Sequence, residues 1–254
     1  MYTCMKEDTR WKLVAGVLLV TLTLAMFTAH YLIFQDSHHL FIFFIGDLAF
    51  IPIEVLIITL IIDQMLESRE KKRRMEKLNM VIGAFFSRFG TPLLAQLARA
   101  DPTIEQVKPR LVIGEKWRND MFLDVQACLN RYSCSITIER VDTVAMREYL
   151  VSHEDFLLRL VENPAIFEHE SFADLIIAIN HLTEEMKARG DLTSLPRSDQ
   201  AHLASDMCRA YSLLVPEWLK YMEYQKEHYP YLFSLAMRSN PFDDAASVVV
   251  LQGT

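Results

Sequence analysis

Two long apolar segments lie near the start of the chain, and apolar positions at helical spacing run through most of the remainder. Residues 13–34 (LVAGVLLVTLTLAMFTAHYLIF) and residues 41–62 (FIFFIGDLAFIPIEVLIITLII) are both 22 residues long and mainly apolar. A helix of that length spans roughly 30 Å, the thickness of the hydrocarbon core of a bilayer. The pattern predicts a transmembrane hairpin over residues 13–63, with helices at 13–34 and 41–63 and a six-residue turn between them.

Basic residues flank this hairpin and are absent from its turn. Lys6, Arg10 and Lys12 precede the first span. We define the basic cluster as the Lys and Arg residues that follow the second span: Arg69, Lys71, Lys72, Arg73, Arg74 and Lys77. Because Lys and Arg are kept on the cytoplasmic side, the sequence predicts a multi-pass protein of the cell (inner) membrane with both termini cytoplasmic. The cluster lies at the level of lipid head groups, so a surface anchor is its simplest role and specific lipid sensing the alternative.

Two acidic residues interrupt the second span. Asp47 and Glu54 are seven residues apart, or two helical turns. They therefore share one face of the helix and lie about 10 Å apart along its axis. A carboxyl group facing lipid costs several kcal/mol, so acids at this depth predict a site lined by protein or by water.

Polar residues of the first span mirror these acids. Counting outward from the turn places Thr28 level with Asp47, Thr21 level with Glu54, and His30 within about one helical turn of Asp47. In one interpretation the acids are protonated, form hydrogen bonds with these side chains and hold the helices together. In the other, several copies surround an axis and the acids form two rings that attract inorganic cations. Two helices cannot enclose a pore, so the second interpretation requires a homo-oligomer of four or more copies.

A proline and a glycine lie close to the acids. Pro52 removes one backbone hydrogen bond, which predicts a kink in the helix near Ala49. Gly46 directly precedes Asp47 and allows close approach of a neighbour or local unwinding. Either feature could shape a constriction.

The remainder of the chain predicts helices. Residues 1–12 form a cytoplasmic N-terminus, residues 64–90 a basic helical linker, residues 91–242 a cytoplasmic helical domain, and residues 243–254 a flexible tail. The fold class is all-α, a two-helix transmembrane hairpin whose second span continues into a cytoplasmic helical bundle.

Within the domain, stop and start signals divide the helices. Gly90 is expected to end the linker, with Thr91 as the next N-cap and Pro92 as the first helical residue. The helices are expected at residues 101–109, 116–132, 142–162, 167–189 and 199–228, followed by an aromatic-rich turn at 229–233. A short strand at 133–138 is discounted because no partner strand is in view.

The net charge and the cysteine positions argue against some classes of function. The net charge of −7 argues against nucleic acid as a partner. Cys4, Cys128, Cys134 and Cys208 lack metal-ligand spacing. Neither a zinc site nor a disulfide framework is indicated, and free thiols suit a reducing cytoplasm.

Motifs of catalysis and metal binding are also missing. The sequence contains no Gly-rich phosphate loop, GxSxG or HExxH motif. We therefore expect no enzyme, no cofactor and no metal. The His-acid trios at 153–155 and 168–170 are explained by helix N-termini, because adjacent helical residues point in different directions. His169 and His181 are too far apart to share one ion. Asp36, His38 and His39 are interpreted as exposed polar residues of the turn, with a divalent ion or pH sensing as the alternative.

Three segments resemble an uncharacterised prokaryotic family of two-span membrane proteins with a cytoplasmic helical domain. They are GDLAFIPIEVLIITLIIDQMLESRE, EKLNMVIGAFFS and YPYLFSLAMRSNPF. The resemblance implies this architecture from the second span to Phe242 and carries no activity, ligand or catalytic residue.

The function expected from the sequence is an oligomeric, ion-conducting membrane protein. A cation pathway would be lined by Asp47 and Glu54, and the cytoplasmic domain would assemble or gate it. The alternative is a membrane-anchored scaffold or sensor whose helical domain binds a protein partner.

Overall fold

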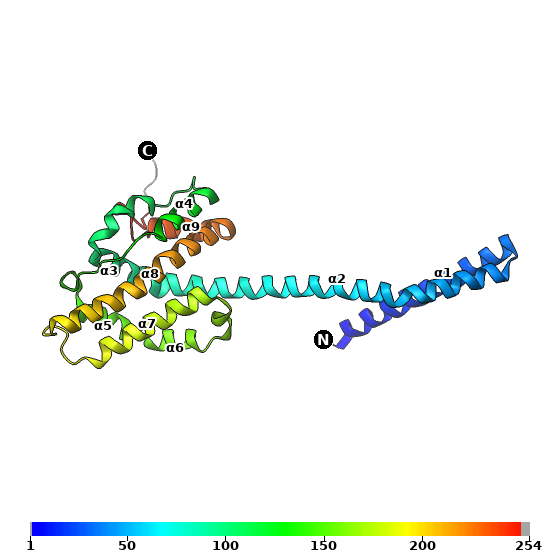
Figure 1. Cartoon of the computed structure of the whole chain (residues 1–254), viewed down its shortest axis with the longest axis horizontal. Helices are drawn as coiled ribbons and strands as arrows, with labels where there is room; N and C mark the ends of the chain where they lie inside the picture. The colour runs from blue at the N-terminus through cyan, green and yellow to red at the C-terminus, as the bar shows by residue number, and fades with distance from the viewer. Residues whose placement is uncertain (1, 250–254) are drawn as a thin grey trace. The chain divides into compact units, whose positions relative to one another are not determined.

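Helices account for all regular secondary structure in the described part of the chain, which is residues 2–249 of a computed structural model, with side chains described for residues 10–249. The predicted all-α fold class is therefore confirmed. The chain divides into two compact units, Met1–Glu70 and Lys71–Thr254 (Figure 1).

The first unit is a hairpin of α1 (Tyr2–Phe34) and the first part of α2 (Ser37–Phe85). Only Gln35 and Asp36 connect the two helices, and Gln35 takes a positive φ of 48° to reverse the chain. The ring centroids of Phe27 on α1 and Phe44 on α2 are 6.3 Å apart, so the helices run back alongside each other.

The turn is thus shorter than the six residues predicted. The Asp36 carboxylate accepts hydrogen bonds from the backbone N–H groups of His38 (3.0 Å) and His39 (3.1 Å). Asp36 therefore caps the N-terminus of α2, and both histidines lie in the first turn of that helix.

Pro52 and Gly46 both lie inside a continuous α2. A Cβ atom added at Gly46 would meet nothing within 4 Å in the same chain. No close approach within one chain therefore requires glycine at this position.

The second unit starts on the C-terminal part of α2. This helix passes without a break through the π-helix η1 (Phe86–Gly90) into α3 (Thr91–Ala100). The helix stop predicted at Gly90 is therefore wrong, because Gly90 has helical dihedral angles (φ −64°, ψ −43°). Glycine is needed here for packing, since a Cβ atom would lie 2.6 Å from Phe85 Cε1 and 2.8 Å from Phe86 Cδ1.

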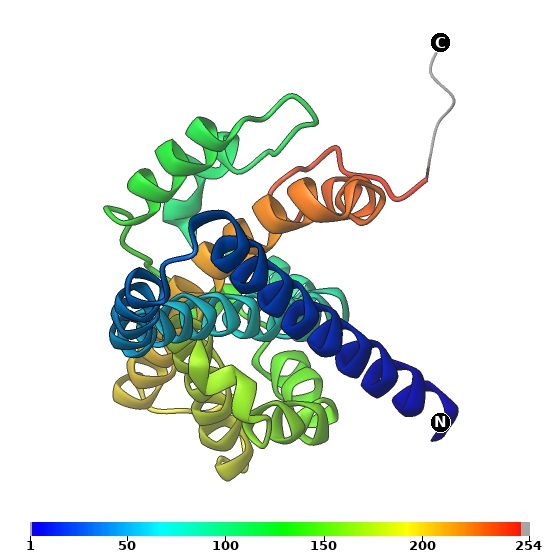
Figure 2. The ribbon, with the colours of Figure 1, turned by 90° about the vertical axis from the view of Figure 1, so that its right-hand side faces the viewer.

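The rest of this unit consists of short helices followed by two long ones. In chain order they are η2 (Pro102–Gln106), η3 (Lys108–Arg110), α4 (Asn119–Leu129), η4 (Ile138–Arg140), α5 (Thr143–Ser152), α6 (Glu154–Val161), η5 (Pro164–Glu168), α7 (Glu170–Ala188), α8 (Arg197–His228) and α9 (Pro230–Arg238). α7 and α8 pack against each other as an antiparallel pair (Figures 1 and 2).

Three predicted segments differ from the observed helices. The single helix expected over 101–109 is replaced by the two short 3-10 helices η2 and η3. The single helix expected over 142–162 is broken at His153, whose Nδ1 lies 2.8 Å from the Tyr149 carbonyl oxygen at the end of α5. The aromatic turn expected at 229–233 is the start of α9, where Pro230 occupies the first helical turn.

Aromatic side chains form much of the core of the second unit. Trp218 and Tyr211 on α8 are buried, as are Phe85, Phe86 and Phe89 where α2 passes into η1. The ring centroids of Phe86 and Tyr221 are 4.9 Å apart in a stacked arrangement. α8 is thereby fixed against the helical segment that enters the domain.

A disulfide joins Cys134 to Cys208, with their Cα atoms 5.6 Å apart. The expectation of free thiols is wrong for this pair and holds for Cys128, while the side chain of Cys4 lies outside the described residues. The two bridged cysteines are 74 residues apart, so their proximity arises only from the tertiary fold.

Candidate functional site

Two helices are long and apolar enough to cross a membrane, α1 from Arg10 to Phe34 and α2 from Ser37 onward. None of the apolar stretch of either helix is buried inside the chain. Large apolar side chains along both helices are exposed, among them Leu18, Phe50 and Ile58. A surface this extensive and this apolar marks contact with lipid or with other protein.

Asp47 and Glu54 are exposed on α2 within this apolar surface. Neither carboxylate forms a hydrogen bond or an ion pair with another described residue. Both acids are therefore available to groups outside their own chain.

The threonines that the sequence placed level with the acids bond to their own helix. Thr21 Oγ1 donates to the Val17 carbonyl oxygen at 2.5 Å, and Thr28 Oγ1 donates to the Leu24 carbonyl oxygen at 2.7 Å. This is the usual bond of a helical threonine to the residue four positions earlier. Within one chain, the described residues include no hydrogen bond from these hydroxyls to Asp47 or Glu54.

His30 lies nearer the turn. Its ring packs against Phe34 with centroids 4.8 Å apart, and its Nδ1 is buried without a hydrogen-bond partner among the described residues. A cavity of about 420 Å³ beside it is lined by His30, Phe34, Asp36, His39 and Phe43. The N–H groups of α2, that of His39 first, lower the pKa of Asp36, so this turn carries a negative charge at neutral pH.

All side chains of the basic cluster are exposed. Arg74 Nη1 lies 3.2 Å from Glu168 Oε1 in the second unit, which ties one member of the cluster to the helical domain. An exposed pair of this kind contributes at most about 1 kcal/mol to stability. Because its side chains are exposed, the cluster can meet an anionic surface.

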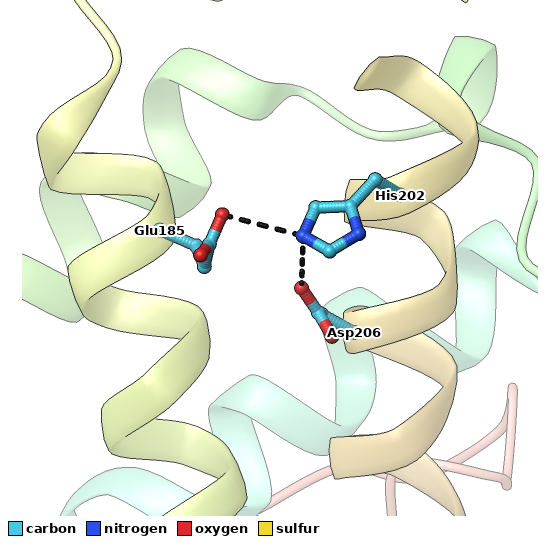
Figure 3. A group of neighbouring side chains, drawn as sticks. All are labelled: Glu185, His202 and Asp206. Atoms are coloured by element: carbon cyan, nitrogen blue, oxygen red, sulfur yellow. Dashed lines mark ion pairs between the residues drawn. The ribbon is translucent and has the colours of Figure 1, made fainter. Parts of the chain in front are cut away.

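A separate group of metal-type ligands lies between α7 and α8. Glu185 extends from α7 towards His202 and Asp206 on α8 (Figure 3). His202 Nε2 is 3.4 Å from Glu185 Oε2 and 3.3 Å from Asp206 Oδ2. His181, one turn before Glu185, places its Nε2 3.7 Å from the same Asp206 oxygen. We refer to His181, Glu185, His202 and Asp206 as the interhelix quartet.

The sequence contained a signal for this quartet that was missed. His181 and Glu185 are four residues apart, as are His202 and Asp206, so each pair lies on one helix face. His181 and His169, on the same helix, are 12 residues apart and do not reveal it. What the sequence could not show is that the two pairs face each other across the packed helices.

A cavity of about 1020 Å³ in the second unit has many charged residues in its lining. Lys108 Nζ forms a salt bridge with the Asp244 carboxylate at 2.6 Å. The buried Asp101 carboxylate accepts hydrogen bonds from the hydroxyl groups of Thr103 and Tyr132. Lys108, Asp244 and Asp101 are thus engaged with other groups of the chain.

Comparisons with known proteins identify the family. Residues 6–66 match the family described as "MJ1433, N-terminal helical domain", and residues 74–238 match "Uncharacterized protein MJ1433, C-terminal helical domain". A relative named "Uncharacterized protein MJ1433", from Methanocaldococcus jannaschii, is 40% identical over 243 residues, which cover 96% of this chain and 98% of the relative. No solved structure matches the chain. The resemblance to an uncharacterised prokaryotic family is thus confirmed.

Proposed function

The chain belongs to the MJ1433 family, whose description carries no activity, so we propose a function from the site itself. In this proposal the chain is an oligomeric integral membrane protein whose second apolar helix lines a cation pathway. One observation carries the proposal. Asp47 and Glu54 sit in a span-length apolar helix and have no partner among the described residues of their own chain.

The energetic argument starts from the cost of these acids in lipid. An Asp at the centre of a membrane helix costs about 3 kcal/mol on insertion scales. That cost falls when the carboxyl meets water, a cation or a polar group of another protein. Since the hydroxyl groups of Thr21 and Thr28 donate to their own helix backbone, the group that lowers the cost of the acids has to come from outside the chain.

Assembly of several copies lowers the free-energy cost of placing these acids in the membrane. Asp47 and Glu54 are two helical turns apart, so copies arranged around an axis present two acidic rings about 10 Å apart. Rings of carboxylates attract cations and line a hydrated path. A hairpin contributes two helices per chain, so four or more copies are needed to enclose such a path.

The basic residues give the orientation in this proposal. Lys6, Arg10 and Lys12 before the first helix, and the basic cluster after the second, place both ends of the hairpin in the cytoplasm. The cluster then meets anionic head groups, and each charge contributes about 1 kcal/mol. The helical domain lies on the cytoplasmic side, where it assembles or gates the copies, and no catalytic step is assigned to it.

A second candidate is a membrane-anchored scaffold or sensor that binds a protein partner. It is favoured by a largely apolar groove of about 610 Å³ in the second unit. Its walls include Met80, Phe86, Tyr221 and Leu232. A groove of this character accepts an apolar helix face of a partner.

The native mass of the full chain in nanodiscs separates the two candidates first. The pathway requires four or more copies. A monomer or dimer that persists through several mild extractions leaves too few helices for a pore and supports the scaffold.

Cation flux into proteoliposomes then tests the acids. Asp47→Asn and Glu54→Gln should each change the rate or the ion selectivity while the native mass stays the same. Glu67→Gln is the matched control, because Glu67 is an exposed acid of α2 beyond the apolar segment. Flux equal to that of protein-free liposomes, or unchanged flux in both span variants, would contradict the proposal.

A further inference from the structure

The geometry points to a binding site for a divalent transition-metal ion at the interhelix quartet, His181 and Glu185 on α7 with His202 and Asp206 on α8. Two imidazoles and two carboxylates form a donor set that suits Zn²⁺ and its first-row neighbours. The site lies in the helical domain and does not depend on the proposed cation pathway.

The helices position the four donors. Residues four positions apart lie on the same helix face, one turn above the other. His181 and Glu185 therefore face α8 together, and His202 and Asp206 face α7 together. Glu185 of α7 is directed towards His202 and Asp206 of α8 (Figure 3), and His181 places its Nε2 3.7 Å from Asp206 Oδ2.

The donor spacing matches a coordination sphere. Zn²⁺ bonds to histidine nitrogen and carboxylate oxygen are about 2.0–2.1 Å long, which gives about 3.3–3.4 Å between neighbouring donors of a tetrahedron. Three observed separations are close to this value: His202 to Asp206 at 3.3 Å, His202 to Glu185 at 3.4 Å, and His181 to Asp206 at 3.7 Å. The donor atoms of Glu185, His202 and Asp206 all lie within 4.8 Å of one another. Glu185 has a long side chain, so a change of rotamer can bring it closer to a shared ion.

Asp206 provides independent support. Its side chain is only 3% exposed, and its Oδ2 atom, which faces both histidines, has no hydrogen-bond partner among the described residues. A buried carboxylate oxygen without a hydrogen bond is costly. A metal ion at the centre of the quartet would satisfy this oxygen.

Two arginine side chains hold the carboxylates of the quartet, as outer residues do in metal sites. Arg189 Nη1 donates to Glu185 Oε2 at 2.7 Å, and Arg209 Nη1 lies 3.3 Å from Asp206 Oδ1. Carboxylates that bind metals are commonly held by such outer hydrogen bonds. Asp206 Oδ2, which has no hydrogen-bond partner among the described residues, and the second lone pair of Glu185 Oε2 would be left for the ion.

The ion would connect α7 to α8 close to the loop that joins them. Residues 189–196 link the end of α7 to the start of α8. Binding at the quartet therefore stabilises this pair of helices, and the stabilisation increases with the concentration of free ion.

Metal binding should be measured on the tag-free full chain in nanodiscs after removal of metal with a chelator. Titration with Zn²⁺ should reach one ion per chain and raise the unfolding temperature. Co²⁺ should give the visible absorption of a tetrahedral nitrogen and oxygen site. His202→Gln and Asp206→Asn should each lower the Zn²⁺ affinity by about tenfold or more.

Two variants serve as controls. His228→Gln removes a histidine at the far end of α8, and Cys128→Ser removes a free thiol of the helical domain, so neither should change the affinity.

The competing arrangement is an ion-pair network in which a protonated His202 bridges Glu185 and Asp206. It predicts that His202→Gln lowers the unfolding temperature equally with and without Zn²⁺. That result, or less than one-tenth of an ion per chain with both Zn²⁺ and Co²⁺, would overturn the inference. His202 is exposed, so this variant should fold even if Asp206→Asn does not.

Discussion

Replacing Gly90 by alanine should destabilise the helical domain, although alanine is the better helix former. Gly90 has helical dihedral angles, so helix propensity alone would favour alanine by about 1 kcal/mol. The opposing effect is steric. The new Cβ atom would lie 2.6 Å from Phe85 Cε1 and 2.8 Å from Phe86 Cδ1, whereas carbon atoms pack best at about 3.5–4.0 Å.

The two rings have little room to move. Phe85 and Phe86 are 0% exposed. The Phe85 ring meets Phe172 with centroids 5.3 Å apart, and the Phe86 ring stacks on Tyr221. Overpacking in such a core costs about 1–3 kcal/mol. We take the upper part of this range because two rings are affected, and the net destabilisation is then about 1–2 kcal/mol after helix propensity is subtracted.

Gly83→Ala is a control with the opposite expected sign. A Cβ atom at Gly83 would meet Gln225 Nε2 at 3.6 Å and Tyr221 Cε2 at 3.9 Å, which are ordinary contacts. Alanine should therefore stabilise the helix here by about 0.5–1 kcal/mol.

Thermal unfolding of the full chain in nanodiscs, followed by tryptophan fluorescence, measures both changes. The midpoint should fall by about 2–8 °C for Gly90→Ala and rise by about 1–4 °C for Gly83→Ala. A midpoint for Gly90→Ala equal to or above that of the unmodified chain would refute the steric argument.

Two further predictions concern the same domain. Cys208→Ser should lower the free energy of unfolding by about 4 kcal/mol under non-reducing conditions, because the bond to Cys134 closes a loop of 74 residues. Equal stability of the variant and the unmodified chain, or alkylation of both thiols in the native protein, would contradict this prediction. Asp191→Asn should destabilise the domain at neutral pH, because hydrogen bonds from Thr193 and Ser194 lower the pKa of Asp191 from 3.8 to about 2. Since the folded-state pKa is depressed, this stabilisation is complete above pH 3.8 and disappears as the pH falls towards 2, so the two unfolding midpoints should converge over that range. A constant difference between them would show that another effect of the substitution dominates.

The sequence predicted the helical architecture because the signals for it are local. Apolar runs of 22 residues and helical spacing over residues 91–242 identify helices without knowledge of their partners. Local signals also misled at Gly90, where glycine followed by threonine and proline is typical of a helix boundary. The glycine instead accommodates two phenylalanine rings, a requirement that appears only in the packed structure.

The interhelix quartet shows the same limit for a site. Its two halves are visible in the sequence as a histidine followed four residues later by an acid. Their meeting depends on the register of α7 against α8, which no local pattern determines. The same holds for Cys134 and Cys208, whose spacing of 74 residues resembles no motif.

The disulfide and the basic residues place different constraints on the compartment of the helical domain. The basic cluster contributes about 1 kcal/mol per charge on an anionic cytoplasmic leaflet, and the turn between α1 and α2 carries no Lys or Arg. Basic residues act while the hairpin inserts, whereas Cys134 and Cys208 are 74 residues apart in sequence and meet through the tertiary fold. The orientation in the proposed function therefore follows the basic residues, which favour a cytoplasmic helical domain. Cytoplasmic disulfides persist mainly in hyperthermophilic prokaryotes. Both sulfur-bearing residues are half-buried, which limits access of reducing thiols to the bond.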